Sequence, residues 1–249
     1  MTLCFDNISY RYRPWGKDVL AGFGYELPDG LTILLGPNGA GKSTLLRLGA
    51  SVTYPRRGQV GVDGISSKAR DFRRHVSWMP QTVTAMTGLT AREQVSYTGW
   101  LKGMKRSEAW DASLDALATV NLVDQADHRT KTLSGGQLRR LGVASATIHR
   151  SSVLLLDEPT AGMDPTQRRT FRDILTRIAD RGVKVLMSTH DVADLAEDAS
   201  HVTVMSHGQI RYDGPTYDYL RYAPGGTPES RLAEAAYTVL TLGGSAVPQ

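Results

Sequence analysis

Short apolar runs alternate with amphipathic segments along much of the chain. Residues 31–35, 153–156, 183–187 and 202–205 are mainly apolar, and their length and character are typical of buried strands. Between the second and third runs, apolar residues recur at the spacing of one helix face. They are followed by a glycine that favours the end of a helix: Phe171, Ile174, Leu175, Ile178 and Gly182. This alternation of strands and helices predicts a parallel sheet covered by helices.

The first 35 residues have the signals of short strands and turns. A candidate strand at 19–27 is followed by a strong turn sequence, Pro-Asp-Gly, at 28–30. Further along, the patterns predict a helix at 42–48, a strand at 75–79 and a helix over 192–196.

The region from about residue 82 to residue 150 lacks strand signals. Residues 90–93, Thr-Ala-Arg-Glu, form a capping box that predicts the start of one helix, and Ser107 is a candidate cap for the next. We therefore expect a helical insertion at about 82–150 within an α/β unit.

Composition narrows the class of protein. The chain has 249 residues, of which 41% are hydrophobic, and a single cysteine, so it can bury a sizeable core and cannot form an internal disulfide.

No apolar run approaches the roughly 20 residues that span a bilayer, and the first residues lack the features of a secretory signal. We expect a cytoplasmic chain that reaches a membrane through a partner. The net charge of +4 comes without interleaved basic and aromatic residues, which disfavours nucleic-acid binding.

Residues 36–43 follow an apolar run and match the pattern G-x-x-x-x-G-K-[ST], the P-loop. Its glycines let the backbone curl around a phosphate chain, which backbone N–H groups and the start of the next helix then hold. The lysine reaches the β- and γ-phosphates of ATP, and the serine hydroxyl binds Mg²⁺. The predicted nucleotide-binding residues here are Gly36, Pro37, Asn38, Gly39, Ala40, Gly41, Lys42, Ser43 and Thr44.

The apolar run at 153–156 ends in two acids, Asp157 and Glu158. Mg²⁺ bound to phosphates needs a carboxylate near it, and Asp157 at the strand end is placed for that role. Hydrolysis also needs a group that orients and deprotonates a water molecule in line with the γ-phosphate. Glu158 is the candidate for this general base.

A further phosphate-binding feature lies about twenty residues before the acid pair, at 133–137, Leu-Ser-Gly-Gly-Gln. Ser134 and Gln137 match a capping box, and Gly135 and Gly136 leave the first N–H groups of the next helix open to an anion. This pentapeptide resembles the signature of the ABC ATPase family. The resemblance implies that it binds the γ-phosphate of an ATP molecule held by the P-loop of a second subunit.

Two catalytic positions are implied by the same resemblance. Gln81, in Trp-Met-Pro-Gln, resembles the family glutamine that contacts Mg²⁺ or the attacking water. His190, which follows an apolar run, resembles the switch histidine that contacts the γ-phosphate and positions Glu158. Together with Glu158 and Lys42, these two residues form the expected catalytic set.

Two nucleotide-contacting positions complete the family pattern. Asp164 ends the sequence Ala-Gly-Met-Asp, which departs from the more common Ser-Ala-Leu-Asp of the family loop that contacts the second subunit. Tyr12 lies 30 residues before Lys42 and resembles the aromatic residue that stacks on adenine, and Tyr10 is the alternative candidate for this role.

The resemblance covers roughly residues 3–215 and implies the fold. That fold is α/β: a P-loop NTPase core with a mainly parallel sheet, an N-terminal antiparallel β subdomain and an inserted helical subdomain. The expected ABC ATPase domain spans 1–220, with the helical insertion at about 82–150. A short C-terminal helical extension and tail follow at 221–249, of which 242–249 are expected to be frayed.

The implied function is Mg²⁺-dependent ATP hydrolysis by the ATP-binding subunit of an ABC transporter. The family works as a head-to-tail dimer, here either homo- or heteromeric, that docks on an integral-membrane transporter subunit at the cytoplasmic face of the membrane. Residues 89–104 resemble the same stretch in exporters whose membrane subunits are separate chains, and the short extension also favours export over import.

The alternative is a soluble ABC-type ATPase that is not involved in transport. Relatives that act on DNA carry long coiled coils or zinc modules, and relatives that act in translation join two cassettes in one chain. This sequence has one cassette and one cysteine, which favours transport. The presence of Lys42, Asp157, Glu158 and His190 disfavours an inactive binding module.

Overall fold

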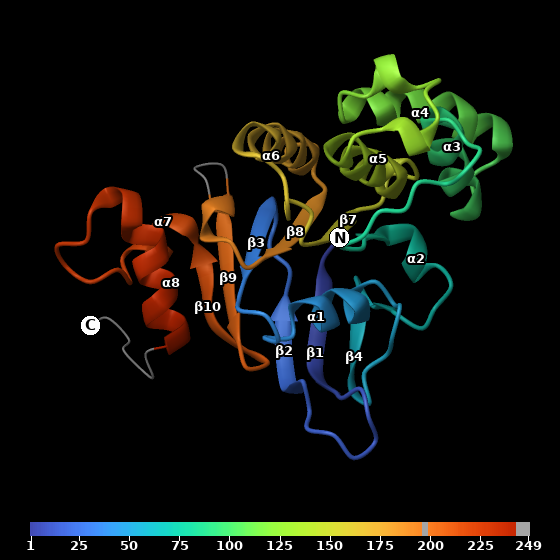
Figure 1. The fold of residues 1–249 in the computed structure, drawn as a ribbon. Coiled ribbons are helices and arrows are strands. Elements are labelled where there is room, and N and C mark those ends of the chain that lie inside the picture. The colour runs from blue at the N-terminus through green and yellow to red at the C-terminus, as the bar shows by residue number, and fades with distance from the viewer. Residues whose placement is uncertain (196–198, 243–249) are drawn as a thin grey trace.

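The computed structural model describes residues 1–195 and 199–242, which form two sheets surrounded by helices (Figure 1). The larger sheet has the strand order β10-β9-β3-β8-β7-β6. All its neighbouring strands pair in parallel except the antiparallel pair β9–β10. The strands are β3 (Leu31–Leu35), β6 (Val76–Met79), β7 (Val153–Asp157), β8 (Lys184–Thr189), β9 (His201–Ser206) and β10 (Gln209–Pro215). The mainly parallel sheet predicted from the sequence is confirmed.

The smaller sheet is antiparallel, with the order β2-β1-β4-β5. Its strands are β1 (Leu3–Tyr10), β2 (Leu20–Glu26), β4 (Arg57–Val62) and β5 (Ile65–Ser66). Helix α1 (Lys42–Gly49) packs between the two sheets, because its leucines share one buried cluster with Phe5 of the small sheet and with Leu34 and Leu155 of the large sheet. The small sheet thereby fixes the helix that follows the P-loop.

The helical insertion consists of α3 (Ala91–Leu101), α4 (Arg106–Thr119) and α5 (Gly135–Thr147), with short 3-10 turns at Val123–Gln125 and Thr130–Thr132. Figure 1 shows these helices grouped at one end of the molecule, beyond β7. Helix α3 begins at the predicted capping box. The Glu93 N–H donates to Thr90 Oγ1 at 3.2 Å, and the Thr90 N–H donates to Glu93 Oε2 at 2.7 Å.

The remaining helices cover the parallel sheet and its β9–β10 end. They are α2 (Phe72–His75), α6 (Pro165–Ala179), α7 (Thr216–Leu220) and α8 (Leu232–Leu242), with a 3-10 turn at Glu229–Arg231. The predicted apolar face of α6 is buried, from Phe171 to Ile178. Helix α8 packs beside α7 and β9, and Tyr219 and Ala236 join the larger core cluster. Within residues 1–195 and 199–242, no helix combines the length and the apolar character needed to cross a membrane.

Two local predictions are wrong. Ser107 does not cap α4: the Glu108 carboxylate accepts the backbone N–H of Lys105 at 3.2 Å, so the helix begins earlier and Ser107 lies in its first turn. The helix expected over 192–196 is only a 3-10 turn at Val192–Asp194, and Leu195 leaves the helical conformation with a ψ of 49°. Residue 196 and residues 243–249 of the expected tail lie outside the described residues.

Candidate nucleotide site

The carboxyl ends of β3, β7 and β8 bring three of the predicted motifs to one edge of the parallel sheet. Strand β3 ends directly before the P-loop, β7 ends at Asp157, and β8 ends one residue before His190. In open α/β sheets, ligands bind outside the carboxyl ends of the strands. This edge is therefore the place where a nucleotide site is expected.

Residues 36–41 form a tight loop between β3 and α1. The backbone of Gly36 packs directly on β9, since a Cβ there would lie 2.3 Å from the Met205 carbonyl oxygen. Gly41 has a φ of 107°, a left-handed conformation that favours glycine and lets the chain turn into α1. The loop therefore ends at a helix N-terminus, whose free N–H groups and positive dipole end favour an anion.

Lys42 is held inside this loop and is only 4% exposed. Its Nζ donates to the carbonyl oxygens of Gly36 at 2.6 Å and Pro37 at 3.2 Å. Burial lowers the pKa of Lys42, while the carboxylates of Glu158 and Asp157 act in the opposite direction. The nearest carboxylate oxygen, Glu158 Oε1, is 3.9 Å from Nζ. The ammonium group is thus paired mainly with loop carbonyls.

Of the three residues predicted to hold Mg²⁺, Ser43, Asp157 and Gln81, the first two meet in the structure. The Ser43 hydroxyl donates to Asp157 Oδ1 at 2.9 Å, and the Ser188 hydroxyl donates to the same oxygen at 2.9 Å. Asp157 is 4% exposed. Mg²⁺ prefers oxygen ligands and usually takes one or two from the protein, with the others from phosphates and water. A hydroxyl and a carboxylate at hydrogen-bond distance fit that requirement.

Glu158 joins the catalytic residues that the sequence predicts. It has a φ of 45°, and its backbone N–H donates to the Ser188 hydroxyl at 3.1 Å. A non-glycine residue in this conformation costs roughly 1–3 kcal/mol and is frequent at functional sites. Gln81 Nε2 donates to Glu158 Oε2 at 3.1 Å, and His190 Nδ1 lies 3.2 Å from Oε1. Gln81, which follows β6, and His190, which follows β8, therefore converge on the Glu158 carboxylate, which follows β7.

The helix end at 134–137 forms as predicted but does not join this cluster. The Gln137 N–H donates to the Ser134 hydroxyl at 3.3 Å, and the Ser134 N–H donates to Gln137 Oε1 at 2.8 Å. A side chain added at Gly135 would meet open space. Within the described part of the chain, no hydrogen bond links 134–137 to the P-loop. Asp164 likewise caps α6, by accepting the Gln167 N–H at 2.8 Å.

Of the two candidate aromatic residues, Tyr12 is the more open. Its side chain is 56% exposed, and its hydroxyl lies 2.7 Å from Thr44 Oγ1, directly after the P-loop. The Tyr10 ring packs edge-on against the Tyr12 ring, with centroids 5.2 Å apart, and its hydroxyl accepts from Thr53 Oγ1 at 3.3 Å. More than half of the Tyr12 side chain is therefore open beside the loop, whereas Tyr10 has both its ring and its hydroxyl in contacts.

Two residues that shape the site were not predicted from the sequence. Ser188 binds both Asp157 and the Glu158 backbone. Arg139, on α5, donates to the carbonyl oxygens of Pro159 at 2.9 Å and Ala161 at 2.6 Å, and burial lowers its pKa. It lies two residues after the 133–137 motif, but arginine pairs recur throughout the chain, so spacing alone does not single it out.

Comparison with known proteins agrees with this geometry. The family model described as ABC transporter matches residues 26–161. The chain is 35% identical over 230 residues to the phosphonates import ATP-binding protein PhnC 2 of a Synechococcus strain, covering 86% of this chain and 85% of the relative. It is 34% identical over 204 residues to the daunorubicin/doxorubicin resistance ATP-binding protein DrrA of Streptomyces peucetius, covering 81% of this chain and 62% of that relative.

A solved structure has the same fold. The dimeric structure of a bacterial ABC transporter cassette matches with a TM-score of 0.75 and 23% identity, covering 86% of this chain and 98% of that chain.

A parallel sheet with a P-loop after β3 and an acid pair at the end of β7 defines the class of P-loop nucleoside triphosphatases. Within that class, the chain belongs to the ABC transporter family: it is an ATP-binding subunit and an ATPase.

Proposed function

We propose that ATP binds with its phosphates on the P-loop and its adenine on Tyr12, and that Glu158 is the general base for its hydrolysis. The observation that carries this proposal is the convergence of Gln81 and His190 on the Glu158 carboxylate, with Lys42 Nζ 3.9 Å away. When bound, Mg²⁺ would neutralise phosphate charge from a position at Ser43, Asp157 and Gln81, the residues that the sequence assigned to it.

In this proposal each contacting residue has a separate role in the reaction. Glu158 takes a proton from water as the water oxygen bonds to the γ-phosphorus, and the bond from that phosphorus to the bridging oxygen of ADP breaks. His190 Nδ1 lies beside the Glu158 carboxylate, and the other ring nitrogen, as Nε2–H, donates to a γ-phosphate oxygen. Lys42 exchanges its two carbonyl partners for phosphate oxygens, which form stronger charge-assisted hydrogen bonds.

We further propose that two copies of the chain form a head-to-tail dimer with ATP between them. The capped helix end at 134–137 offers N–H groups suited to phosphate but has no hydrogen bond to the P-loop of its own chain in the described residues. A second chain would bring its 134–137 segment, and the neighbouring Asp164 loop, to that P-loop. A dimeric cassette is among the solved structures with this fold.

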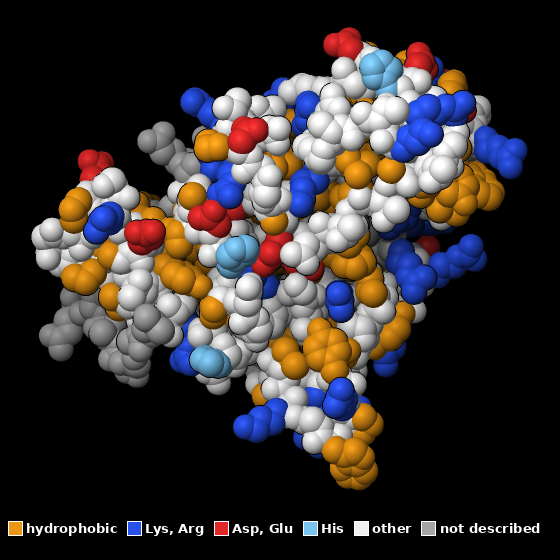
Figure 2. Space-filling model, viewed as in Figure 1, with side chains coloured by type: hydrophobic (Ala, Val, Ile, Leu, Met, Phe, Trp, Pro, Cys, Tyr) orange, Lys and Arg blue, Asp and Glu red, His pale blue; other side chains and the backbone are white. Residues whose placement is uncertain are grey.

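We propose that the helical insertion docks on an integral-membrane transporter subunit at the cytoplasmic face of the membrane. Tyr97 and Trp100 are 42% exposed and Leu101 is 59% exposed, although all three are large and hydrophobic. Figure 2 shows hydrophobic and basic side chains side by side over this part of the molecule. Exposed apolar patches of this kind mark protein interaction sites.

The proposed direction of transport is export. It rests on the resemblance of residues 89–104 to the same stretch in exporters. The relatives include proteins named for import and for resistance, at similar identity.

Co-purification tests the membrane docking. Tagged protein is expressed in its native host, membranes are extracted in mild detergent with a non-hydrolysable ATP analogue, and captured proteins are identified. We expect a multi-span membrane protein in stoichiometric amount, reduced in a Tyr97→Ser, Trp100→Ser variant. The control variant, Tyr217→Ser, removes an aromatic that is 67% exposed elsewhere and should capture normally. Recovery on ribosomes or nucleic acid instead would contradict the proposal.

Direction is tested on the captured complex, reconstituted in vesicles with the ATP sites facing outward. Export predicts that host compounds accumulate inside these vesicles when ATP is added outside. Release of preloaded host compounds under the same conditions would reverse the assignment.

A further inference from the structure

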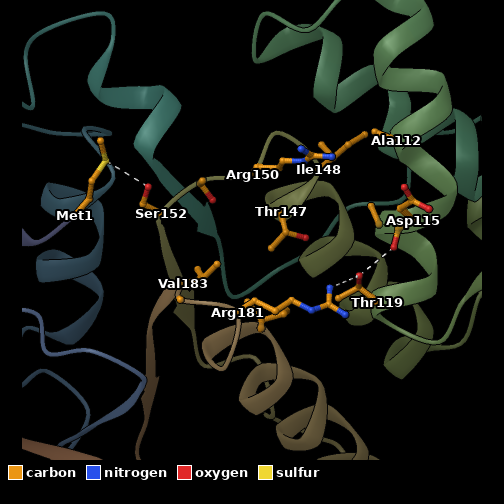
Figure 3. A pocket seen from close by; sticks show the side chains of 14 residues that line it. Met1, Ala112, Asp115, Thr119, Thr147, Ile148, Arg150, Ser152, Arg181 and Val183 are labelled. Atoms are coloured by element: carbon orange, nitrogen blue, oxygen red, sulfur yellow. Dashed lines mark hydrogen bonds between the residues drawn. The ribbon is translucent and has the colours of Figure 1, made fainter.

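A cavity of about 520 Å³ lies at the edge of the parallel sheet opposite the nucleotide site (Figure 3). Its lining includes residues 150–152, directly before β7, and residues 181–183, directly before β8. The nucleotide site lies at the other ends of these same strands. The cavity therefore shares none of the residues assigned above to ATP, Mg²⁺ or catalysis.

The cavity is built across the junction between the helical insertion and the sheet. Helix α4 and the end of α5 form one wall, and the end of α6 contributes to the other. Its apolar lining comprises Met1, Ala112, Ala116, Ile148, Ile178 and Val183. The volume falls within the range of roughly 300–1,000 Å³ that is usual for small-molecule sites. The apolar lining suits the hydrocarbon part of a ligand.

Two arginines supply hydrogen-bond donors to this cavity. Figure 3 shows Arg150 and Arg181 reaching from the sheet side toward α4, on different sides of the space. Arg181 Nη1 donates to Thr119 Oγ1 at 3.3 Å. Among the residues that the structure describes, nothing accepts a hydrogen bond from the Arg150 guanidinium. Asp115 is the one acidic lining residue, so cationic donors outnumber carboxylates.

A buried hydroxyl adds a second, independent feature. Ser151 lines the cavity, is 3% exposed, and its Oγ has no hydrogen-bond partner in the described part of the chain. Buried polar atoms almost always have a partner in native proteins. A rotation of the Ser151 side chain toward the cavity would let a ligand oxygen supply that partner.

We infer that this cavity is a second ligand site, which takes a small organic anion with an apolar body. The anionic group, a carboxylate or sulfonate, binds the guanidinium of Arg150 and the Ser151 hydroxyl, with Arg181 on the opposite side. The planar fork of arginine matches such groups with paired hydrogen bonds. The apolar body lies against Ala112 and Ala116 of α4.

Anilinonaphthalene sulfonate is a suitable probe, because it is an aromatic anion whose fluorescence rises in an apolar site. The titration uses the full chain with the nucleotide site saturated by a non-hydrolysable ATP analogue. We expect one saturable site per chain. Arg150→Ser and Ser151→Ala should each weaken binding about tenfold, the usual loss of a hydrogen bond to a charged group. Ala112→Trp should fill the cavity and abolish binding.

A matched control is Arg70→Ser, which removes an exposed arginine that does not line the cavity. It should bind the probe like the parent chain. Arg150 has no partner in the described residues, so Arg150→Ser should keep the parent melting temperature and ATP-analogue affinity. Absence of saturable binding, or equal affinity in the parent, Arg150→Ser and Ala112→Trp proteins, would overturn the proposal. Neither result bears on the nucleotide site, which stays occupied throughout.

Discussion

The Glu158 carboxylate is contacted from two sides by groups that follow different strands. Gln81 Nε2 reaches one oxygen and His190 Nδ1 lies next to the other. Because each oxygen has its own partner, the carboxylate is fixed in orientation, which a positioned base requires. The left-handed backbone at this residue directs it out of the strand end.

Glu158→Gln should reduce hydrolysis by about 10²–10⁴, the usual contribution of a positioned base. The amide keeps the shape of the side chain but cannot take a proton, so ATP affinity should stay unchanged. Phosphate release and nucleotide binding measure the two effects. Glu229→Gln, in the exposed turn before α8, is the control and should hydrolyse ATP normally. Near-normal turnover in Glu158→Gln would remove Glu158 from the role of base.

Lys42→Ala should weaken ATP binding itself. The lysine forms hydrogen bonds to loop carbonyls that phosphate oxygens can replace, and a charge-assisted hydrogen bond contributes roughly 1.5–3 kcal/mol. Affinity should therefore fall about 10- to 100-fold. Equilibrium binding of a fluorescent ATP analogue measures this, with Lys68→Ala as the exposed control. Full affinity in Lys42→Ala would contradict the proposed phosphate contact.

At this scale, sequence patterns indicated positions whose motifs depend on fixed spacing. Ser43 and Asp157 are far apart in the chain and were both assigned to Mg²⁺, and the structure places their side chains at hydrogen-bond distance. Ser188 and Arg139 were not predicted, because each acts on backbone groups of a segment that becomes its neighbour only in the folded chain.

Between elements, a buried hydroxyl takes part in joining the helical insertion to the sheet. The Ser77 hydroxyl of β6 donates to the Ala146 carbonyl of α5 at 2.5 Å and lies 3.2 Å from His149 Nε2. Burial, with a smaller contribution from Lys102, lowers the pKa of His149 to about 4. The folded protein therefore keeps this histidine neutral at pH values where the unfolded chain protonates it.

Stability should consequently fall as the pH decreases from about 6.5 toward 4. The unfolded chain takes up a proton near pH 6.5, the ordinary pKa of histidine, and the folded chain does so only near 4. The free energy of unfolding should be lower by up to about 2 kcal/mol at pH 5 than at pH 7. Urea unfolding at pH 7 and pH 5 measures it. The side chain of the His149→Gln variant cannot titrate, so this variant should lose correspondingly less unfolding free energy between pH 7 and pH 5. An equal loss in both proteins would exclude His149 as the source.

Arg139 connects α5 to the segment after β7, so its replacement should affect two elements together. Arg139→Lys keeps the charge but loses the planar fork that binds several carbonyls. We expect hydrolysis to fall, with a loss of roughly 2–3 kcal/mol in unfolding free energy. Arg140→Lys is the matched control, since Arg140 binds the carbonyls of Val120 and Asn121, away from the acid pair. Comparable losses in both variants would show that the effect comes from α5 as a whole and not from the Arg139 contacts.

The elements that were predicted well have strong periodic patterns or complete caps. Helix α6 has a full apolar face, and α3 has both capping hydrogen bonds. The errors at Ser107 and at 192–196 lie at the ends of helices. Glu108 accepts the Lys105 N–H and moves the start of α4, and Leu195 leaves the helical conformation directly after Val192–Asp194.

For the molecule as a whole, the two halves of the proposed ATP contact belong to different elements of the fold. The P-loop stands at the strand ends, and the helix end at 134–137 has no hydrogen bond to it within the described residues. The family resemblance predicted the small antiparallel sheet, and the strand order β10-β9-β3-β8-β7-β6 was not predicted. Alternation of strands and helices alone predicted a parallel sheet but not this order, because long-range pairing leaves no local pattern.

The dimer with ATP between its subunits is tested most directly by the molecular mass of Glu158→Gln in solution with ATP. We predict a shift from 27.2 kDa to twice that mass on adding ATP. In the same background, Ser134→Thr should dimerise. Ser134→Asp should keep the helix cap yet stay monomeric, since its carboxylate repels the γ-phosphate. An ATP-bound Glu158→Gln protein that remains a monomer, or a Ser134→Asp variant that dimerises equally well, would contradict the proposed arrangement.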